Sequence, residues 1–376
     1  MTGTPSRQRV LLHVGVPKSG TTFLQATLAL NHDALQAAGV LECGTRKESF
    51  LAAVDVRRTH EAWGRSRTEV AGTWDHLCQR ALRHDGTSVI SQELLAAASE
   101  DQVSAALAPL RGVEVHVIVT ARDLARQVAA EWQEGIKHGR RLTFDQFRRR
   151  VVAVDAETDY AKKFRAAQDL PGVLARWSTH LPRQRVHIVC CPRPTSDRAL
   201  LWRRFAEVVG QDITNLPSAG PQHDNASLGT VEIDLLRRVN IALDKRLPQP
   251  EYGQVVKQLY AQRLLTTSRS PRPVVPEGLY DDLRVISQRW VKELTDVGYA
   301  VHGDLDELIP ESTEARTPHP DDVDTDVQVD VAARTTAELL LELQRYRARN
   351  AQLEQQHTKL EKRRKKLTNK LARFGD

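Results

Sequence analysis

The chain has 376 residues, which is enough for one large α/β domain with an appendage or for two modest domains. Its net charge of +6 suits anionic ligands but is too small an excess to indicate nucleic acid as a partner. The four cysteines, Cys43, Cys78, Cys190 and Cys191, show neither metal-ligand spacing nor a disulfide framework. No apolar run approaches ~20 residues and the polar N-terminus lacks a signal peptide's apolar core, so we expect a cytoplasmic protein without a membrane span.

The first predicted strand is the apolar run at residues 10–14, and residues 15–22 (GVPKSGTT) follow it directly. A strand that turns through glycines into a helix points backbone N–H groups and the positive end of the helix dipole at one small volume. Lys18 adds a positive charge, and the hydroxyls of Ser19, Thr21 and Thr22 add hydrogen-bond donors. The stretch therefore predicts a phosphate-binding loop that opens a helix at Phe23.

The loop differs from the nucleotide-binding loop of ATPases and P-loop kinases. Gly15 and Gly20 have the spacing of that motif, but Thr21 stands where its lysine would be, and Lys18 lies inside the loop. A threonine cannot place a charge on the β- and γ-phosphates, which weakens the case for triphosphate chemistry. A P-loop kinase remains an alternative.

Three further strands are predicted, at residues 87–90, 113–120 and 186–190, with helical patterns between them. The helix after the third strand has apolar positions at Leu124, Val128, Trp132 and Ile136, and Thr143 with Gln146 has the form of a capping box. Residues 42–75 show weak periodicity and are predicted as loop and short helices. This alternation predicts an α/β fold with a doubly wound parallel sheet, whose ligands bind at the carboxyl ends of the strands.

The C-terminal part divides into three predicted segments. Residues 199–310 look mostly helical and complete an α/β domain of residues 1–310, and the acidic, proline-containing residues 311–331 predict a disordered linker. Residues 332–376 predict a coiled-coil helix that pairs as a homodimer, with a single charged helix as the alternative, and the basic run at residues 362–366 is interpreted as a solvated face. The apolar heptad row is Leu339, Tyr346, Leu353, Leu360, Leu367 and Phe374, and the companion row is Leu343, Asn350, His357, Arg364 and Leu371.

The loop, with its internal lysine before Ser-Gly-Thr-Thr, resembles the 5′-phosphosulfate loop of sulfotransferases, in particular those of bacterial type. The resemblance implies a P-loop-like sulfotransferase fold and 3′-phosphoadenosine 5′-phosphosulfate (PAPS) as co-substrate. It implies transfer of a sulfuryl group to a hydroxyl, or an amine, of a small-molecule or carbohydrate acceptor, with no metal required. Lys18 would act in catalysis, and the donor would be bound by Pro17, Lys18, Ser19, Gly20, Thr21, Thr22 and Phe23.

The resemblance also implies that Arg122, at the end of the third predicted strand, binds the 3′-phosphate of the nucleotide. In the family this arginine precedes Asp or Asn and then Pro, and a Ser eight residues later also binds the phosphate. Here Leu124 replaces the proline and Ala130 replaces the serine, which removes a bond to a charged group worth roughly 1.5–3 kcal/mol. Arg126 or Gln127 could substitute.

A base is needed to take the proton of the acceptor. Glu93 is the first candidate because it directly follows the second predicted strand, where some related sulfotransferases place a glutamate base. His13, inside the first strand, is the second candidate. A non-catalytic binding or scaffolding protein that acts through its coiled coil is a further alternative, supported by Ala130.

Overall fold

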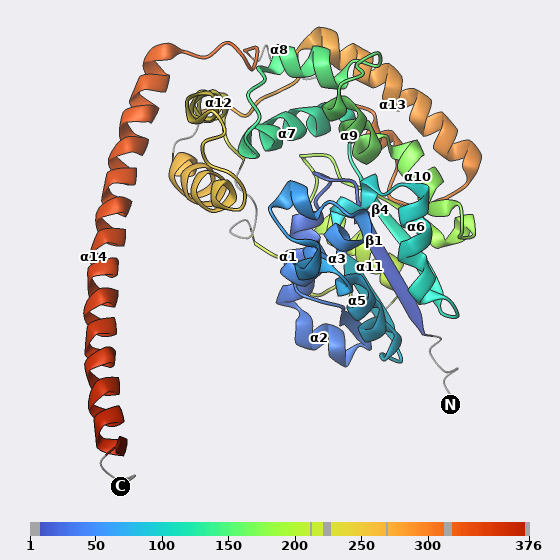
Figure 1. Ribbon diagram of the computed structural model, residues 1–376. Helices are drawn as coiled ribbons and strands as arrows, with labels where there is room; N and C mark the ends of the chain where they lie inside the picture. Colours follow the sequence, from blue (N-terminus) through green and yellow to red (C-terminus); the bar gives the residue numbers. More distant parts are fainter. Residues whose placement is uncertain (1–7, 211–212, 221–226, 268–269, 312–317, 373–376) are drawn as a thin grey trace.

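The computed structural model describes residues 8–210, 213–220, 227–267, 270–311 and 318–372, and the side chains up to residue 369 (Figure 1). Six parallel strands form its central sheet, and helices cover both faces. In spatial order the strands are β2 (Val40–Glu42), β3 (Thr87–Ser91), β1 (Arg9–Gly15), β4 (Glu114–Ala121), β5 (Val186–Cys190) and β6 (Ala300–His302). The predicted α/β class with a parallel sheet is confirmed.

The four predicted strands are the four inner strands of the sheet, and their bounds agree with the prediction to within one or two residues. The two edge strands, β2 and β6, were not predicted, since three residues give too short an apolar pattern to recognise. Residues 42–75 are more regular than predicted. They contain the end of β2, α3 (Arg46–Arg57), η1 (His60–Trp63), α4 (Arg67–Val70) and the first turn of α5 (Thr73–Leu82).

Side chains alternate between the two faces of the sheet and pack into two cores. Val10, Leu12 and Val14 of β1 face one core, whose helices are α3, α5, α6 (Glu100–Leu107) and α10 (Leu170–Ser178). Leu11 faces the other core, with α1 (Thr21–Leu30), α2 (His32–Ala37) and α11 (Ala199–Val209). This two-sided burial explains why the inner strands read as continuous apolar runs.

A third core lies beyond the carboxyl ends of the strands, and its helices form the upper part of Figure 1. They are α7 (Leu124–Lys137), α8 (Phe144–Phe147), α12 (Thr230–Leu243), the π-helix η7 (Gly253–Leu264) and α13 (Glu277–Val297), with α9 (Asp159–Gln168) beside them. The predicted capping box is confirmed, because the Thr143 side chain accepts a hydrogen bond from the amide of Gln146 at the start of α8. The short remaining helices are η2 (Glu93–Ala97), η3 (Ala108–Leu110), η4 (Arg148–Val152), η5 (Arg183–Arg185), η8 (Leu265–Thr267) and η9 (Leu305–Leu308).

The order of the strands places a topological switch point between β1 and β4. The chain leaves β1 toward β2 on one side of the sheet and leaves β4 toward β5 on the other. In such sheets the crevice for a ligand opens at the carboxyl ends of the two strands whose connections diverge. The loop at residues 16–20 follows β1, and Arg122 follows β4, so both lie at this point.

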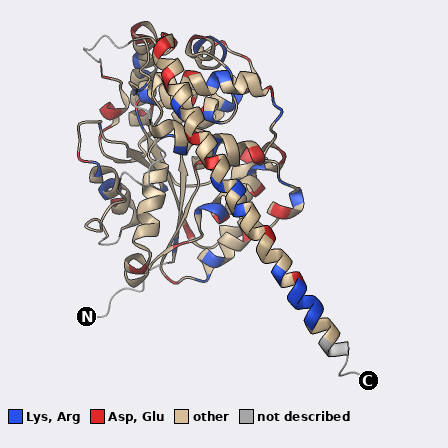
Figure 2. Ribbon diagram, turned by 90° about the vertical axis from the view of Figure 1, so that its left-hand side faces the viewer, with Lys and Arg blue, Asp and Glu red and all other residues tan. Residues whose placement is uncertain are grey.

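The last helix, α14 (Thr325–Ala372), corrects the predicted linker and coiled-coil boundary. The disordered linker predicted for residues 311–331 is wrong over residues 325–331, which are helical, and residues 312–317 lie outside the described residues. The first turns of α14 belong to the body because Val331 and Thr335 are buried, and α14 packs there on α12 and η7. The rest of the helix projects away from the body, and its basic segment lies near the far end (Figures 1 and 2).

None of the described helices is both long and apolar enough to cross a membrane.

Asp321, within the predicted linker, caps α8. Its two carboxylate oxygens accept hydrogen bonds from the amides of Phe144 (2.7 Å) and Asp145 (2.9 Å). We expect Asp321→Ala to lower the free energy of unfolding by about 1–2 kcal/mol, because two amides at a helix start lose their acceptor. Denaturant titration measures this, with the exposed Asp322→Ala as the control. Equal midpoints for the two variants would contradict the capping role.

Candidate anion-binding site

The loop between β1 and α1 has an unusual backbone. Gly15, Lys18 and Gly20 all have positive φ angles, of 83°, 68° and 87°. A Cβ on Gly15 would also lie 2.8 Å from the Cβ of Glu93, so this position requires glycine for two reasons. Lys18 lacks the conformational freedom of glycine, so its left-handed backbone costs about 1–3 kcal/mol. Strained residues of this kind occur preferentially at functional sites.

The loop delivers the chain into the N-terminus of α1. Gly20 is the N-cap and provides no side-chain hydrogen bond, so the first-turn amides of Thr21, Thr22 and Phe23 have no capping side chain. In a helix of ten residues these amides and the helix dipole favour an anion. Thr22 is half-buried, whereas Thr21 and Phe23 are buried and contribute through their backbone.

Ser19 differs from its predicted role as a hydroxyl donor to the ligand. Its side chain is fully buried, and Oγ donates to the carbonyl of Val16 (2.5 Å) and contacts Thr120 Oγ1 (2.6 Å). The hydroxyl therefore fixes the loop, and Ser19 can serve a ligand through its backbone amide. A thiol contact, from Cys191 Sγ to the Ser19 carbonyl at 2.8 Å, fixes the same turn.

Lys18 is paired with a carboxylate on α7 that a lysine of η7 also binds. Its Nζ lies 2.6 Å from Oε2 of Glu134 on α7, and Oε1 of the same carboxylate lies 2.6 Å from Nζ of Lys257 on η7. His138 Nε2 lies 3.0 Å from Glu134 Oε1 and 2.8 Å from Lys257 Nζ. Two lysines and a histidine thus surround one carboxylate beside the loop.

The carboxyl end of β4 adds Arg122, which is oriented by the helix that follows it. Its Nη2 donates to the carbonyl of Arg126 (2.9 Å) and its Nε to Oε1 of Gln127 (3.2 Å). Arg126 is itself paired with Asp123, the N-cap of α7. Burial lowers the pKa of Arg122, but an arginine starts so high that it stays charged near neutral pH.

Gln127 differs from its predicted role as a phosphate ligand. It is buried, and its amide nitrogen donates to the carbonyl of Pro17 and to Oε1 of Gln168 (2.6 Å) while its oxygen accepts from Arg122. Gln168 also donates to Pro17 (3.3 Å) and to Oε1 of Glu131 (2.8 Å). Gln127 thus positions the loop and Arg122 together, and Pro17 takes part through its carbonyl.

The two carboxyls on α7 differ in their pKa values. Burial raises the pKa of Glu131 to about 7, against a smaller opposing effect of Lys18. Burial also acts on Glu134, but Lys18, His138 and Lys257 outweigh it and hold the Glu134 pKa well below its ordinary value. The site therefore combines one firmly ionised carboxylate with one that titrates near neutral pH.

The two candidate bases lie in different surroundings. Glu93 is half-buried at the carboxyl end of β3, next to Gly15, and accepts a hydrogen bond from Gln25 (3.2 Å). His13 is fully buried between Ser91 Oγ (2.8 Å) and Thr120 Oγ1 (3.2 Å), and burial lowers its pKa to about 3. His13 is therefore enclosed and neutral. It packs beneath the loop through its contacts with Ser91 and Thr120 and does not face the crevice.

Sequence reasoning missed Glu131, Glu134, Lys257 and Gln168, and it did not place His138 beside the loop. Glu131, Glu134 and His138 belong with Gln127 to one polar row on α7 and just after it. Its spacing of three or four residues could have been recognised beside the apolar row. Lys257 and Gln168 come from helices that are distant in the sequence, and no local sequence pattern indicates that they lie at the site.

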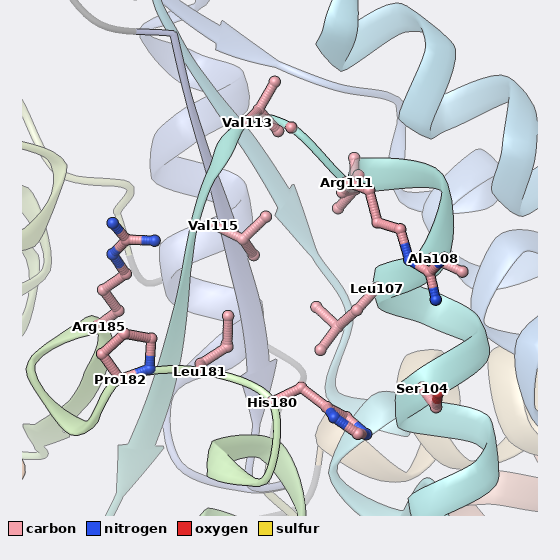
Figure 3. A pocket seen from close by; sticks show the side chains of 12 residues that line it. Ser104, Leu107, Ala108, Arg111, Val113, Val115, His180, Leu181, Pro182 and Arg185 are labelled. Atoms are coloured by element: carbon pink, nitrogen blue, oxygen red, sulfur yellow. The ribbon is translucent and has the colours of Figure 1, made fainter.

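A separate cavity of about 340 Å³ lies at the amino end of β4, away from the loop (Figure 3). Its apolar lining includes Leu107, Val115 and Leu181, and its polar lining includes Arg111, His180 and Arg185. The amino ends of parallel strands are not where this type of sheet binds its ligand. No group of three or more His, Cys, Asp or Glu suited to a metal ion occurs among the described residues.

Comparisons of the chain with family models, with curated proteins and with solved structures found no match.

Glu131→Gln should change how stability depends on pH. The folded-state pKa of about 7 lies above the ordinary glutamate value of 4.5, so wild-type stability falls as pH rises between these values, by roughly 3 kcal/mol for the full shift. The variant lacks this fall and should be the more stable protein at pH 8, with a smaller difference at pH 5. Urea titrations at both pH values, with exposed Glu293→Gln as control, measure it. Parallel pH profiles for wild type and Glu131→Gln would contradict the prediction.

Proposed function

We propose that this protein is a PAPS-dependent sulfotransferase. The observation that carries the proposal is the loop at residues 16–20, which follows β1 at the switch point of the sheet. The lysine of this loop, Lys18, lies before the helix start and has a left-handed backbone conformation. Uncapped amides of α1 lie next to this lysine, and Arg122 lies at the end of the adjacent strand β4. A donor with a 5′-phosphosulfate and a separate 3′-phosphate needs two such anion contacts.

In the proposed reaction an acceptor oxygen attacks sulfur, the bond between sulfur and the bridging phosphate oxygen breaks, and 3′-phosphoadenosine 5′-phosphate (PAP) leaves. Lys18 and the amides of α1 stabilise the negative charge that develops on the leaving phosphate. Arg122 binds the 3′-phosphate, and its bonds to Gln127 and to the Arg126 carbonyl set the direction of its guanidinium. Glu93 accepts the proton of the acceptor hydroxyl or amine, since it lies at the carboxyl end of β3 beside the loop.

Binding of PAP tests the donor site by calorimetry. Lys18→Ala and Arg122→Ala should each weaken PAP binding at least tenfold, because each removes a charged contact to a phosphate. Lys163→Ala, an exposed lysine on α9, is the matched control and should bind like wild type. Wild-type affinity in both site variants would show that the nucleotide binds elsewhere. Failure of the wild type to bind PAP, or magnesium-dependent binding of ATP in its place, would refute the proposal.

We also propose that α14 pairs with a second copy of this chain. Leu353, Leu360 and Leu367 of the heptad row are each more than half exposed, as is Tyr346. A helix this long with a regular apolar row gains stability by covering it. In a parallel pair in register, Asn350 would face its own copy, and Arg349 of one helix would face Glu354 of the other.

Leu353→Glu should shift the full-length protein from dimer to monomer in sedimentation equilibrium, because it places two carboxylates in one core layer. Leu341→Glu is the matched control, since Leu341 is equally exposed, at 51%, but lies outside the heptad rows. A monomeric wild type, or equal weakening by the two substitutions, would contradict the pairing.

A further inference from the structure

The carboxylate of Glu134 occupies an unusual position for an ion pair. Its two oxygens are bound one each by Lys18 and Lys257, both at 2.6 Å. All three side chains are between 17% and 24% exposed, so the group is shielded but open to exchange with solvent. The two lysines come from different segments, Lys18 from the loop after β1 and Lys257 from η7.

The positive charge at this point exceeds what the Glu134 carboxylate neutralises, and the second carboxyl nearby, Glu131, is only weakly acidic because burial raises its pKa to about 7. Lys18 and Lys257 carry two charges against one on Glu134, and His138 adds a hydrogen bond to the same oxygen that Lys257 binds. The neighbouring Lys137 is almost fully buried, and burial lowers its pKa to about 8. A second anion would therefore be electrostatically favoured here, while the present carboxylate would compete with it.

The backbone around both lysines is also unusual. Lys18 keeps its left-handed φ of 68° at an energetic cost, and Lys257 lies within η7, a π-helix. Such helices are rare and occur frequently at functional sites. The two lysines thus meet at Glu134 through two uncommon backbone conformations, a left-handed residue and a π-helix.

We propose that Lys18 and Lys257 together bind an oxyanion, and that Glu134 occupies its place while the site is empty. The identity of the anion rests on the function proposed above: it is the sulfuryl group of the donor, whose oxygens replace those of the carboxylate. Lys257 is then a second cation for that group, opposite the loop. Glu134 is a competitor that the donor displaces, and it keeps His138 as a partner when the lysines turn to the ligand.

Inorganic sulfate is the probe for this subsite, titrated by calorimetry at pH 8 and constant ionic strength in chloride. Glu134→Gln should bind sulfate at least tenfold more tightly than wild type, because the competing charge is gone. Adding Lys257→Met to that variant should abolish the gain, and Lys163→Met should leave it. Glu131→Gln removes a nearby charge that does not touch Lys18 and should have a much smaller effect.

Three results would overturn the inference: no gain in Glu134→Gln, a gain that survives Lys257→Met, or an equal gain in Glu131→Gln. Should Glu134→Gln fail to fold, Glu134→Asp draws the competing charge back from the lysines by one methylene and is expected to give a smaller gain in sulfate affinity. PAP binding separates this inference from the proposed function. If wild type binds PAP but the sulfate affinity of Glu134→Gln is unchanged by Lys257→Met, only the inference fails. If sulfate behaves as expected but PAP does not bind, the oxyanion site stands and the sulfotransferase proposal falls.

Discussion

Thr120 is the residue through which the sheet holds the loop. Its carbonyl accepts a hydrogen bond from the amide of Val16 (2.7 Å), and its hydroxyl contacts both Ser19 and His13. The pairing of β1 with β4 also slips by one residue between His13 and Gly15, which turns the chain out of the ladder where the loop begins. Every group in this chain of contacts is fully buried, so leaving one unpaired would cost about 1–3 kcal/mol. The positive φ angle of Lys18 persists because this frame determines the loop on both sides.

Helix α7 joins the stability of the fold to the chemistry of the site. Its apolar row, with Val128, Trp132 and Ile136, packs into the core beyond the sheet. Its polar row places Gln127 and Glu134 against the loop. Because both rows belong to one helix whose first residues follow β4 directly, the positions of Arg122 and Lys18 are set by the same packing. Polar groups held by such packing lose little freedom when a ligand arrives, which favours binding.

The parts of the structure that were predictable are those with a local signal. The inner strands carry short apolar runs, and the glycines, Lys18 and the helix start are adjacent in the chain. The loop and its place at the sheet edge therefore follow from the sequence. Arg122 follows from its place after a strand. The side-chain contacts of Ser19 and Gln127 were not predicted, because their partners, Thr120 and the Pro17 carbonyl, are set by the packing of β4 and α7. The linker prediction was wrong over residues 325–331 because the partners of this stretch, on α12 and η7, lie far away in the chain.

The π-helix η7 connects the candidate site with the projecting helix. Lys257 reaches Glu134 from one part of η7, and Arg263, six residues later, donates to Glu342 of α14 at 2.7 Å. Glu342 is nearly buried although residues around it on α14 are exposed, so this contact is where the helix leaves the body. A partner helix covering the apolar row would restrict α14 just beyond that point, and the restriction would act on η7 through Arg263. The same element, η7, therefore holds both Lys257 beside Glu134 and Arg263 at the point where α14 leaves the body.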